Sequence, residues 1–160
     1  MKNIMATTPY DSIKANFYQQ VNDGNRGSVS AILESAEETM AENLLNVQYR
    51  GLNNILQNFH DCGDYTPLKL AIYQNNTDMA LLLLQKGANP NVGSYYVGIN
   101  SLMAAIMQQN KVIAETLIIK GVDTNYEYFG ESSLDYAKKY MPELVPTLEP
   151  MMNNLSHVEL

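Results

Sequence analysis

Only one cysteine, Cys62, and two histidines occur among the 160 residues. A single thiol cannot form an internal disulfide, which fits a reducing compartment, and in its Asp-Cys-Gly loop Cys62 is more typical of a passive residue than of a nucleophile. Structural zinc needs four ligands, and His60 and Cys62 have no second pair of ligand-type residues beside them. We therefore expect neither a disulfide nor a metal site.

Long apolar runs are also missing. The longest runs, such as Met79 to Leu84, have six residues, whereas a membrane-spanning helix needs about 20. The first residues hold no apolar core of the kind found in a secretion signal. We therefore expect a cytoplasmic protein that does not enter the membrane.

Positive charge is scarce, because 10 lysines and arginines face 17 acidic residues and the net charge is -7. Such a chain repels phosphate backbones and anionic lipid, so we expect no binding to nucleic acid or to a membrane surface. A protein partner with a basic surface would be attracted, while acidity also serves solubility alone.

Catalytic motifs are absent as well. The sequence has no glycine-rich phosphate loop, no G-x-S-x-G elbow and no supported Cys-His pair. Asp61 and Asp64 could be read as paired carboxylates, but aspartates in a loop typically accept hydrogen bonds from nearby backbone. We expect a protein that is not an enzyme and that binds no cofactor.

What the sequence does contain is a repeat: DYTPLKLAIYQNNTDMALLLLQKGANPN, residues 64–91, and GINSLMAAIMQQNKVIAETLIIKGVDTN, residues 98–125. Each copy has a helical apolar stretch, a polar break, a second helical stretch and a glycine suited to a left-handed C-cap. So short a unit cannot bury its apolar face alone, so the copies must stack. The landmarks lie 34 positions apart: Leu68 and Leu102, Ala71 and Ala105, Gly87 and Gly121, and Asn91 and Asn125.

The start of each copy carries a capping signal. Thr66 can cap the first helix while Pro67 occupies its first position, where a missing N–H does no harm. Asn100-Ser101 and Ser132-Ser133 can do the same for the next two copies. The third copy lacks the closing Gly and Asn, and Pro142, Pro146 and Pro150 follow where its second helix should lie. We expect an irregular cap there.

These features resemble the ankyrin repeat family. TPLKLA at Thr66 to Ala71 is similar to its T-P-L-H-x-A signature, with Lys69 in place of His, and GANPN and GVDTN are similar to the family's G-A-D-V-N ending. The resemblance covers about 61–150. It implies a mainly α solenoid of stacked helix-turn-helix units, whose hairpin-like fingers and inner helices bind other proteins.

The first sixty residues predict an all-helical N-terminal cap. Residues 17–33 look like a degenerate copy, and the helical period continues to Phe59 with an interruption near residues 49–51. We expect one domain over 1–160: a cap over about 1–60, repeats over 61–150 and a flexible tail over 151–160. Glu34, Glu38 and Glu42, four apart, predict an acidic stripe on one helix, which is either a solvated face or a docking ridge.

Aromatic residues gather in two finger segments, 92–98 and 126–130. A ring left in water gains nothing for folding, whereas aromatic residues dominate the energetic centres of interfaces. We expect Tyr126 and Phe129 to pack on the scaffold, and Tyr95, Tyr96 and Tyr128 to contact a partner. With positions mapped from the family, among them an exposed Ile99, the predicted partner-binding residues are Tyr65, Tyr95, Tyr96, Ile99, Tyr126, Tyr128, Glu131, Asn76 and Asn110.

Together these observations favour a small, non-catalytic protein that binds another protein and blocks or recruits it. The acidic charge suggests an inhibitor or an immunity-type antidote of a basic toxin, monomeric in isolation. Two alternatives stay open: a structural adaptor or self-associating assembly subunit, and a microbial effector that binds a host protein. The residues expected to steer a basic partner are Glu34, Glu38, Glu42, Glu127 and Glu131.

Overall fold

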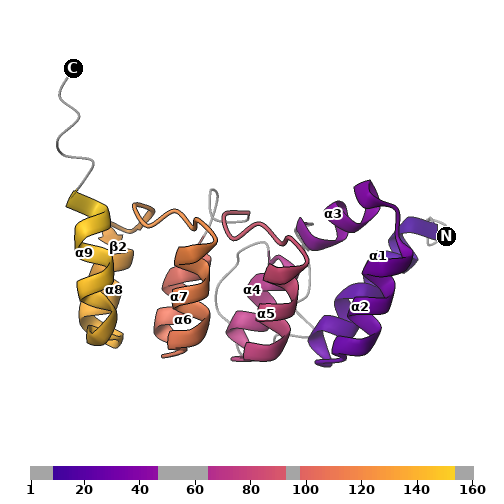
Figure 1. The fold of residues 1–160 in the computed structure, drawn as a ribbon, viewed down its shortest axis with the longest axis horizontal. Helices are drawn as coiled ribbons and strands as arrows, with labels where there is room; N and C mark the ends of the chain where they lie inside the picture. Colours follow the sequence, from indigo (N-terminus) through magenta and orange to yellow (C-terminus); the bar gives the residue numbers. More distant parts are fainter. Residues whose placement is uncertain (1–8, 47–64, 93–97, 154–160) are drawn as a thin grey trace, which may run out of the picture.

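The computed structural model describes residues 9–46, 65–92 and 98–153, which form a row of helices and one short hairpin (Figure 1). Within these ranges no helix is both long and apolar enough to cross a bilayer. The elements are α1 (Pro9–Asn22), α2 (Arg26–Ser35), α3 (Glu38–Asn46), α4 (Pro67–Tyr73), α5 (Thr77–Gln85), α6 (Ser101–Met107), α7 (Lys111–Ile119), β1 (Glu127–Tyr128), β2 (Glu131–Ser132), α8 (Ser133–Tyr140), a 3-10 turn (Pro142–Leu144) and α9 (Val145–Asn153).

The helices form pairs that stand side by side in chain order (Figure 1). α1 packs with α2, α4 with α5, α6 with α7, and α8 with α9. The first helices of successive pairs contact one another in the order α1, α4, α6, α8, and the second helices do so in the order α2, α5, α7. Stacking of this kind joins the apolar faces of short units into one continuous core. The predicted ankyrin-like stack is confirmed.

Equivalent residues of successive copies occupy successive layers. Leu68 and Leu102 are fully buried, and Leu134 packs against the same core from the third copy. Ala71 and Ala105 have no exposed surface. Because alanine is small, neighbouring first helices can approach closely at these positions.

The predicted caps set where the first helices begin. The Thr66 hydroxyl accepts a hydrogen bond from the Lys69 backbone N–H at 3.2 Å, ahead of a proline at the first helical position. Asn100 does the same for Met103 at 2.8 Å. Each side chain pairs one of the backbone donors that a helix start leaves free.

The second helices begin and end in the same repeated way. Asn76 and Asn110 cap α5 and α7 by accepting from the backbone N–H groups three residues on. After the helices, Gly87 and Gly121 have φ values of 98° and 78°, which a residue without Cβ adopts at little cost. The glycine stops expected from the sequence are therefore present.

The third copy ends less regularly than the others, since a 3-10 turn leads into α9, which has Pro146 in its first turn, where no intrahelical N–H bond is lost, and Pro150 inside the helix. One sequence expectation about helix continuity is wrong. The acidic stripe is not on one helix, because α2 ends at Ser35 and Ala36 is extended, with φ -81° and ψ 147°. Glu34 therefore lies on α2, whereas Glu38 lies on α3.

Candidate functional site

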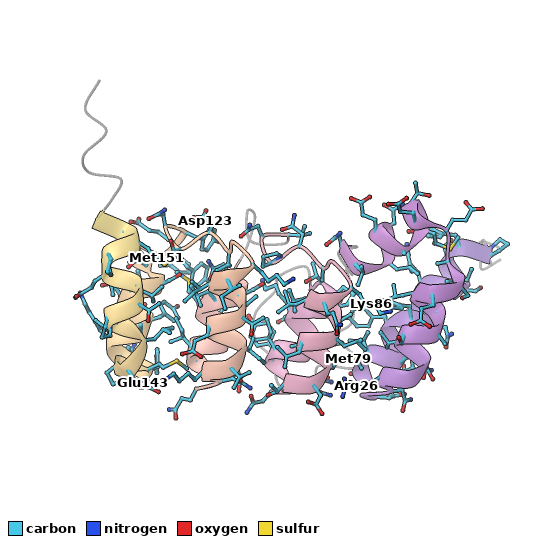
Figure 2. The ribbon with its side chains drawn as sticks, in the orientation of Figure 1. Arg26, Met79, Lys86, Asp123, Glu143 and Met151 are labelled. Carbon is cyan, nitrogen blue, oxygen red and sulfur yellow. The ribbon has the colours of Figure 1, made fainter. Side chains whose placement is uncertain are left out.

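The described parts of the connections that follow α5 and α7 lie along one edge of the row, drawn at the top of Figure 1. Figure 2 shows Asp123 at this edge and Arg26 and Glu143 at the opposite edge. Hydrogen bonds tie the connections together: the side-chain Nδ2 of Asn91 donates to the Gly121 carbonyl at 3.0 Å, and the side-chain Oδ1 of Asn91 accepts from the Asp123 N–H at 2.7 Å. The edge is thus built from residues that recur in successive copies.

The last connection forms a hairpin, which we call the 126–131 finger. Glu127 pairs with Ser132, and Tyr128 pairs with Glu131, so Phe129 and Gly130 form a two-residue turn. Both turn residues have positive φ, 51° and 78°, as a type I′ turn requires. At the base of the finger, the half-buried Tyr126 hydroxyl donates to the Gly98 carbonyl at 2.7 Å. Tyr126 therefore braces the finger against the preceding connection, as expected of a structural ring.

The two aromatic residues at the tip differ from the sequence expectation. Phe129 is 91% exposed, so the expectation that it packs on the scaffold is wrong. Tyr128 is half-buried against the core, and its ring lies 4.5 Å from the Phe129 ring in an edge-to-face arrangement. The reason lies in the hairpin register, which pairs Tyr128 within the ladder and leaves Phe129 in the turn.

The charge of the finger is negative. Glu127 and Glu131 are exposed, and residues 121–132 hold three acidic side chains and no lysine or arginine. On the neighbouring α8, burial raises the pKa of Tyr136 and the Glu131 charge adds to the rise. A hydrogen bond with Tyr140 raises the pKa of Lys139, again with a contribution from Glu131. A cation that approached the finger would meet the same field.

Two predicted contact residues are buried instead. Tyr65 is 6% exposed, with its ring 5.3 Å from the Tyr73 ring, and Ile99 is also 6% exposed. Each residue directly precedes a helix cap, Thr66 or Asn100, where an apolar side chain commonly packs back on its own helix. The expectation of an exposed Ile99 is wrong, and this cap position was the sequence signal that could have shown it. At the matching place in the third copy Glu131 is exposed.

Asn76 and Asn110 have structural partners within the chain. Both cap second helices, and the Asn110 amide also donates to the Asn75 side-chain oxygen and the Thr77 hydroxyl, each at 2.7 Å. These bonds join neighbouring copies. Tyr95 and Tyr96, by contrast, lie outside the described residues.

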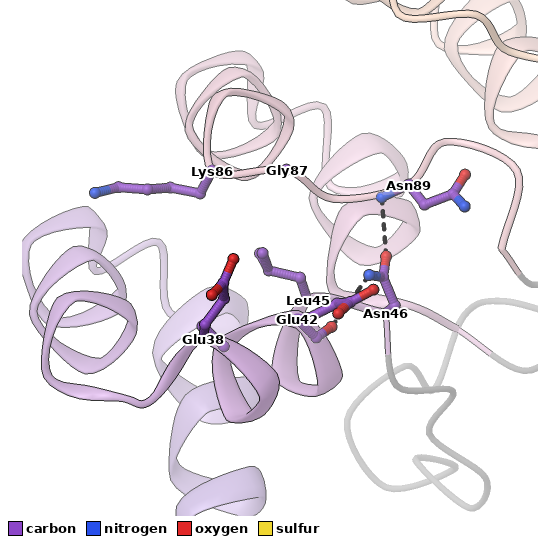
Figure 3. A pocket seen from close by; sticks show the side chains of 8 residues that line it. Glu38, Glu42, Leu45, Asn46, Lys86, Gly87 and Asn89 are labelled. Atoms are coloured by element: carbon purple, nitrogen blue, oxygen red, sulfur yellow. Dashed lines mark hydrogen bonds between the residues drawn. The ribbon is translucent and has the colours of Figure 1, made fainter.

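A second feature is a shallow depression of about 440 Å³ between α3 and the end of α5 (Figure 3). Asn46 closes one side by accepting from the Asn89 N–H at 2.9 Å. Lys86 bonds to Glu34 of α2 at 2.9 Å, and this bond lowers the pKa of Glu34. The depression is lined by Glu38, Ala41, Glu42, Leu45, Asn46, Lys86, Gly87 and Asn89.

The depression offers little for chemistry. In the described parts of the chain no three His, Cys, Asp or Glu side chains are grouped as metal ligands. The Lys86–Glu34 pair joins residues 52 positions apart, and no sequence pattern indicates it. Exposed pairs of this kind contribute little to stability. Because the described residues of the depression include no group of metal ligands, the exposed acidic finger is the better candidate for a binding surface.

Comparison with known proteins adds one match. The family model described as Ankyrin repeat matches residues 63–95, the segment that contains α4, α5 and the start of the connection after them. A search of the curated proteins found no match to the chain.

Proposed function

Since the chain belongs to the ankyrin-repeat family, whose members are typically non-catalytic and whose repeats generally mediate protein–protein interaction, we propose that it binds another protein through its finger edge. The observation that carries the proposal is the 126–131 finger, an exposed, acidic and aromatic hairpin braced by Tyr126. A rigid hairpin loses little conformational freedom on binding, which favours affinity.

The contact surface that we propose is smaller than the set predicted from the sequence. It keeps Tyr128 and Glu131, adds Glu127, and includes Tyr95 and Tyr96 of the preceding finger. Tyr65 and Ile99 are left out because they are buried. Asn76 and Asn110 are left out because their side chains cap helices within the chain.

We further propose that the partner is basic and that binding blocks its surface, as an inhibitor or an immunity-type antidote does. The net charge of -7 and the exposed finger carboxylates support this, because complementary fields speed encounter and disfavour acidic competitors. Glu38 and Glu42 on α3 are also exposed and would extend the field. Steric occupation of the partner requires no catalytic group.

A pull-down from the lysate of the source cells tests the proposal, with the wild-type chain run beside a Tyr95→Ala, Tyr96→Ala, Tyr128→Ala triple variant. Loss of even one interface anchor costs about 2 kcal/mol, so we expect recovery of the partner to fall at least about tenfold. A Val112→Ala variant serves as the control. Val112 is 53% exposed and lies at the N-terminal end of α7, next to the turn from α6 and away from the finger.

Equal recovery of every partner by the wild type and the triple variant would rule out the finger site. Circular dichroism of the triple variant must show the wild-type helical signal, so that loss of binding is not loss of fold. Raising the salt concentration should weaken the captured complex if the partner is basic.

A further inference from the structure

The turn of the 126–131 finger holds a residue that the turn itself disfavours. Type I′ turns favour Asn or Asp followed by Gly, because both central residues need positive φ. Here Phe129 takes the first place with a φ of 51°. The other described non-glycine residues with positive φ are Asn75 and Gln109, which occupy the same place in successive copies, at the α4–α5 and α6–α7 turns. A bulky aromatic residue in this conformation is an outlier, and such strain often marks a binding site.

Packing against the core does not explain the aromatic residue at position 129 either. Phe129 is 91% exposed, and the ring contact recorded for it is the one with Tyr128 at 4.5 Å. That contact covers little of its surface, so most of the ring stays in water. Neither the turn nor the packing requires phenylalanine at this position.

We propose that Phe129 is the anchor of the partner interface and enters an apolar pocket, about one ring wide, whose rim carries lysine or arginine on a basic protein. The inference deepens the proposed function and rests on it. An exposed aromatic side chain that becomes fully desolvated on binding is typical of interface anchors.

Charge on the finger indicates the nature of the rim. Side chains at successive hairpin positions point to opposite faces, so Glu131 lies on the face of its partner Tyr128 and Glu127 lies on the other. Any pocket that receives Phe129 would therefore meet an exposed carboxylate on each side of the ring. Cationic groups at the rim match these two charges, whereas an acidic rim would be repelled.

The short turn also fixes where the ring is presented. Two residues link β1 to β2, and Tyr126 holds the base of the hairpin by its bond to Gly98. An anchor held in this way loses less conformational entropy on binding than a ring on a long loop. A strained but rigid presentation is thus consistent with a role in binding.

Two variants separate the role of the ring from that of the turn. Phe129→Asn places the favoured residue in the turn and should raise Tm by about 2–4 °C, since it relieves the strain. Gln109→Asn is the matched control, because it relieves a φ of 53° in a turn away from the finger and should also raise Tm. A fall in Tm for Phe129→Asn would show that the ring supports the fold and would overturn the proposal.

The probe for binding is β-cyclodextrin, whose apolar cavity admits one phenyl ring, with amino groups placed around its rim. Neutral β-cyclodextrin is the comparison. Backbone amide shifts of residues 127–131 should show the wild type binding the amino form about fivefold or more tightly than the neutral form. The preference should disappear in Glu127→Gln, Glu131→Gln. Binding of the amino form should be lost in Phe129→Asn and kept in Gln109→Asn. Equal binding of the two cyclodextrins by the wild type would overturn the cationic rim.

The same variants separate this inference from the proposed function. If the wild type recovers no partner from lysate, the proposed function fails, while the Tm and cyclodextrin measurements still decide whether the tip is a strained, accessible anchor. If the wild type recovers a partner and Phe129→Asn recovers it equally well, the finger binds but Phe129 is not its anchor. At least a tenfold loss for Phe129→Asn, with none for Gln109→Asn, supports the inference. If the recovered partner is a second copy of this chain, the proposal of a pocket on a basic protein is overturned.

Discussion

Replacing Asn110 by alanine removes three hydrogen bonds, one of which caps a helix and two of which join neighbouring copies. The side-chain oxygen accepts from the Ile113 N–H at 3.1 Å. The amide group donates to Asn75 and to Thr77, both at 2.7 Å. The same residue type at Asn76 caps α5 at 3.1 Å, and no bond from its side chain to a neighbouring copy is recorded among the described residues. Asn76→Ala is therefore the matched control.

The expected losses follow from these bonds. Loss of an N-cap costs about 1 kcal/mol, and each of the partly exposed bonds to Asn75 and Thr77 contributes about 0.5 kcal/mol net. Asn110→Ala should therefore lower the free energy of unfolding by about 2 kcal/mol and Asn76→Ala by about 1 kcal/mol. The Tm should therefore fall by about 4–8 °C for Asn110→Ala and by about 2–4 °C for Asn76→Ala.

Urea unfolding followed by circular dichroism at 222 nm measures both variants. A double-mutant cycle of Asn110→Ala with Thr77→Ala then isolates the contribution of the bond between the copies, expected at about 0.5 kcal/mol. Equal losses for Asn110→Ala and Asn76→Ala, together with zero coupling in the cycle, would refute the reasoning, because the bonds between copies would then contribute nothing.

Two more stability predictions follow from the packing and from a capping carboxylate. Leu102→Ala truncates a fully buried residue and should lower the free energy of unfolding by about 3 kcal/mol. The control Ile119→Ala, at an 82% exposed position, should change the free energy of unfolding by less than about 0.5 kcal/mol. Similar urea midpoints for the two variants would contradict a core at Leu102. Hydrogen bonds from the Ser132 hydroxyl and N–H lower the pKa of Asp135. Because the folded pKa is the lower one, this stabilisation is complete above the ordinary aspartate value of about 4 and is lost as pH falls through the folded value. Urea midpoints should therefore fall more steeply below pH 4 for the wild type than for Asp135→Asn, and parallel curves would count against the capping box.

Much of the repeat could be predicted from the sequence because its signals are local. Thr66 and Asn100 cap helices by bonds to residues three positions on, and Gly121 ends a helix through its own φ. The proline pattern after Met141 is harder to interpret from the sequence. A proline removes a hydrogen bond inside a helix but not in its first turn, and only the observed start of α9 at Val145 put Pro146 in the first turn and Pro150 inside the helix.

The candidate site was less predictable, because exposure depends on what packs nearby. Tyr65 and Ile99 looked like fingertip residues but are buried next to helix caps. Phe129 looked structural but is exposed, since the hairpin register put it in the turn. A hydrophobicity pattern cannot distinguish these outcomes without the packing of neighbouring elements.

By itself, the sequence determined the period, the helix starts, the glycine stops and the acidic charge, since each depends on residues a few positions apart or on composition alone. The tertiary structure decided which rings face water, which carboxylates flank Phe129, and which polar groups join copies, such as Asn110 with Thr77 and Tyr126 with Gly98. These contacts join residues 28 or more positions apart. They form only when helix pairs stack, because stacking brings distant side chains within hydrogen-bonding distance and excludes water from the faces between them.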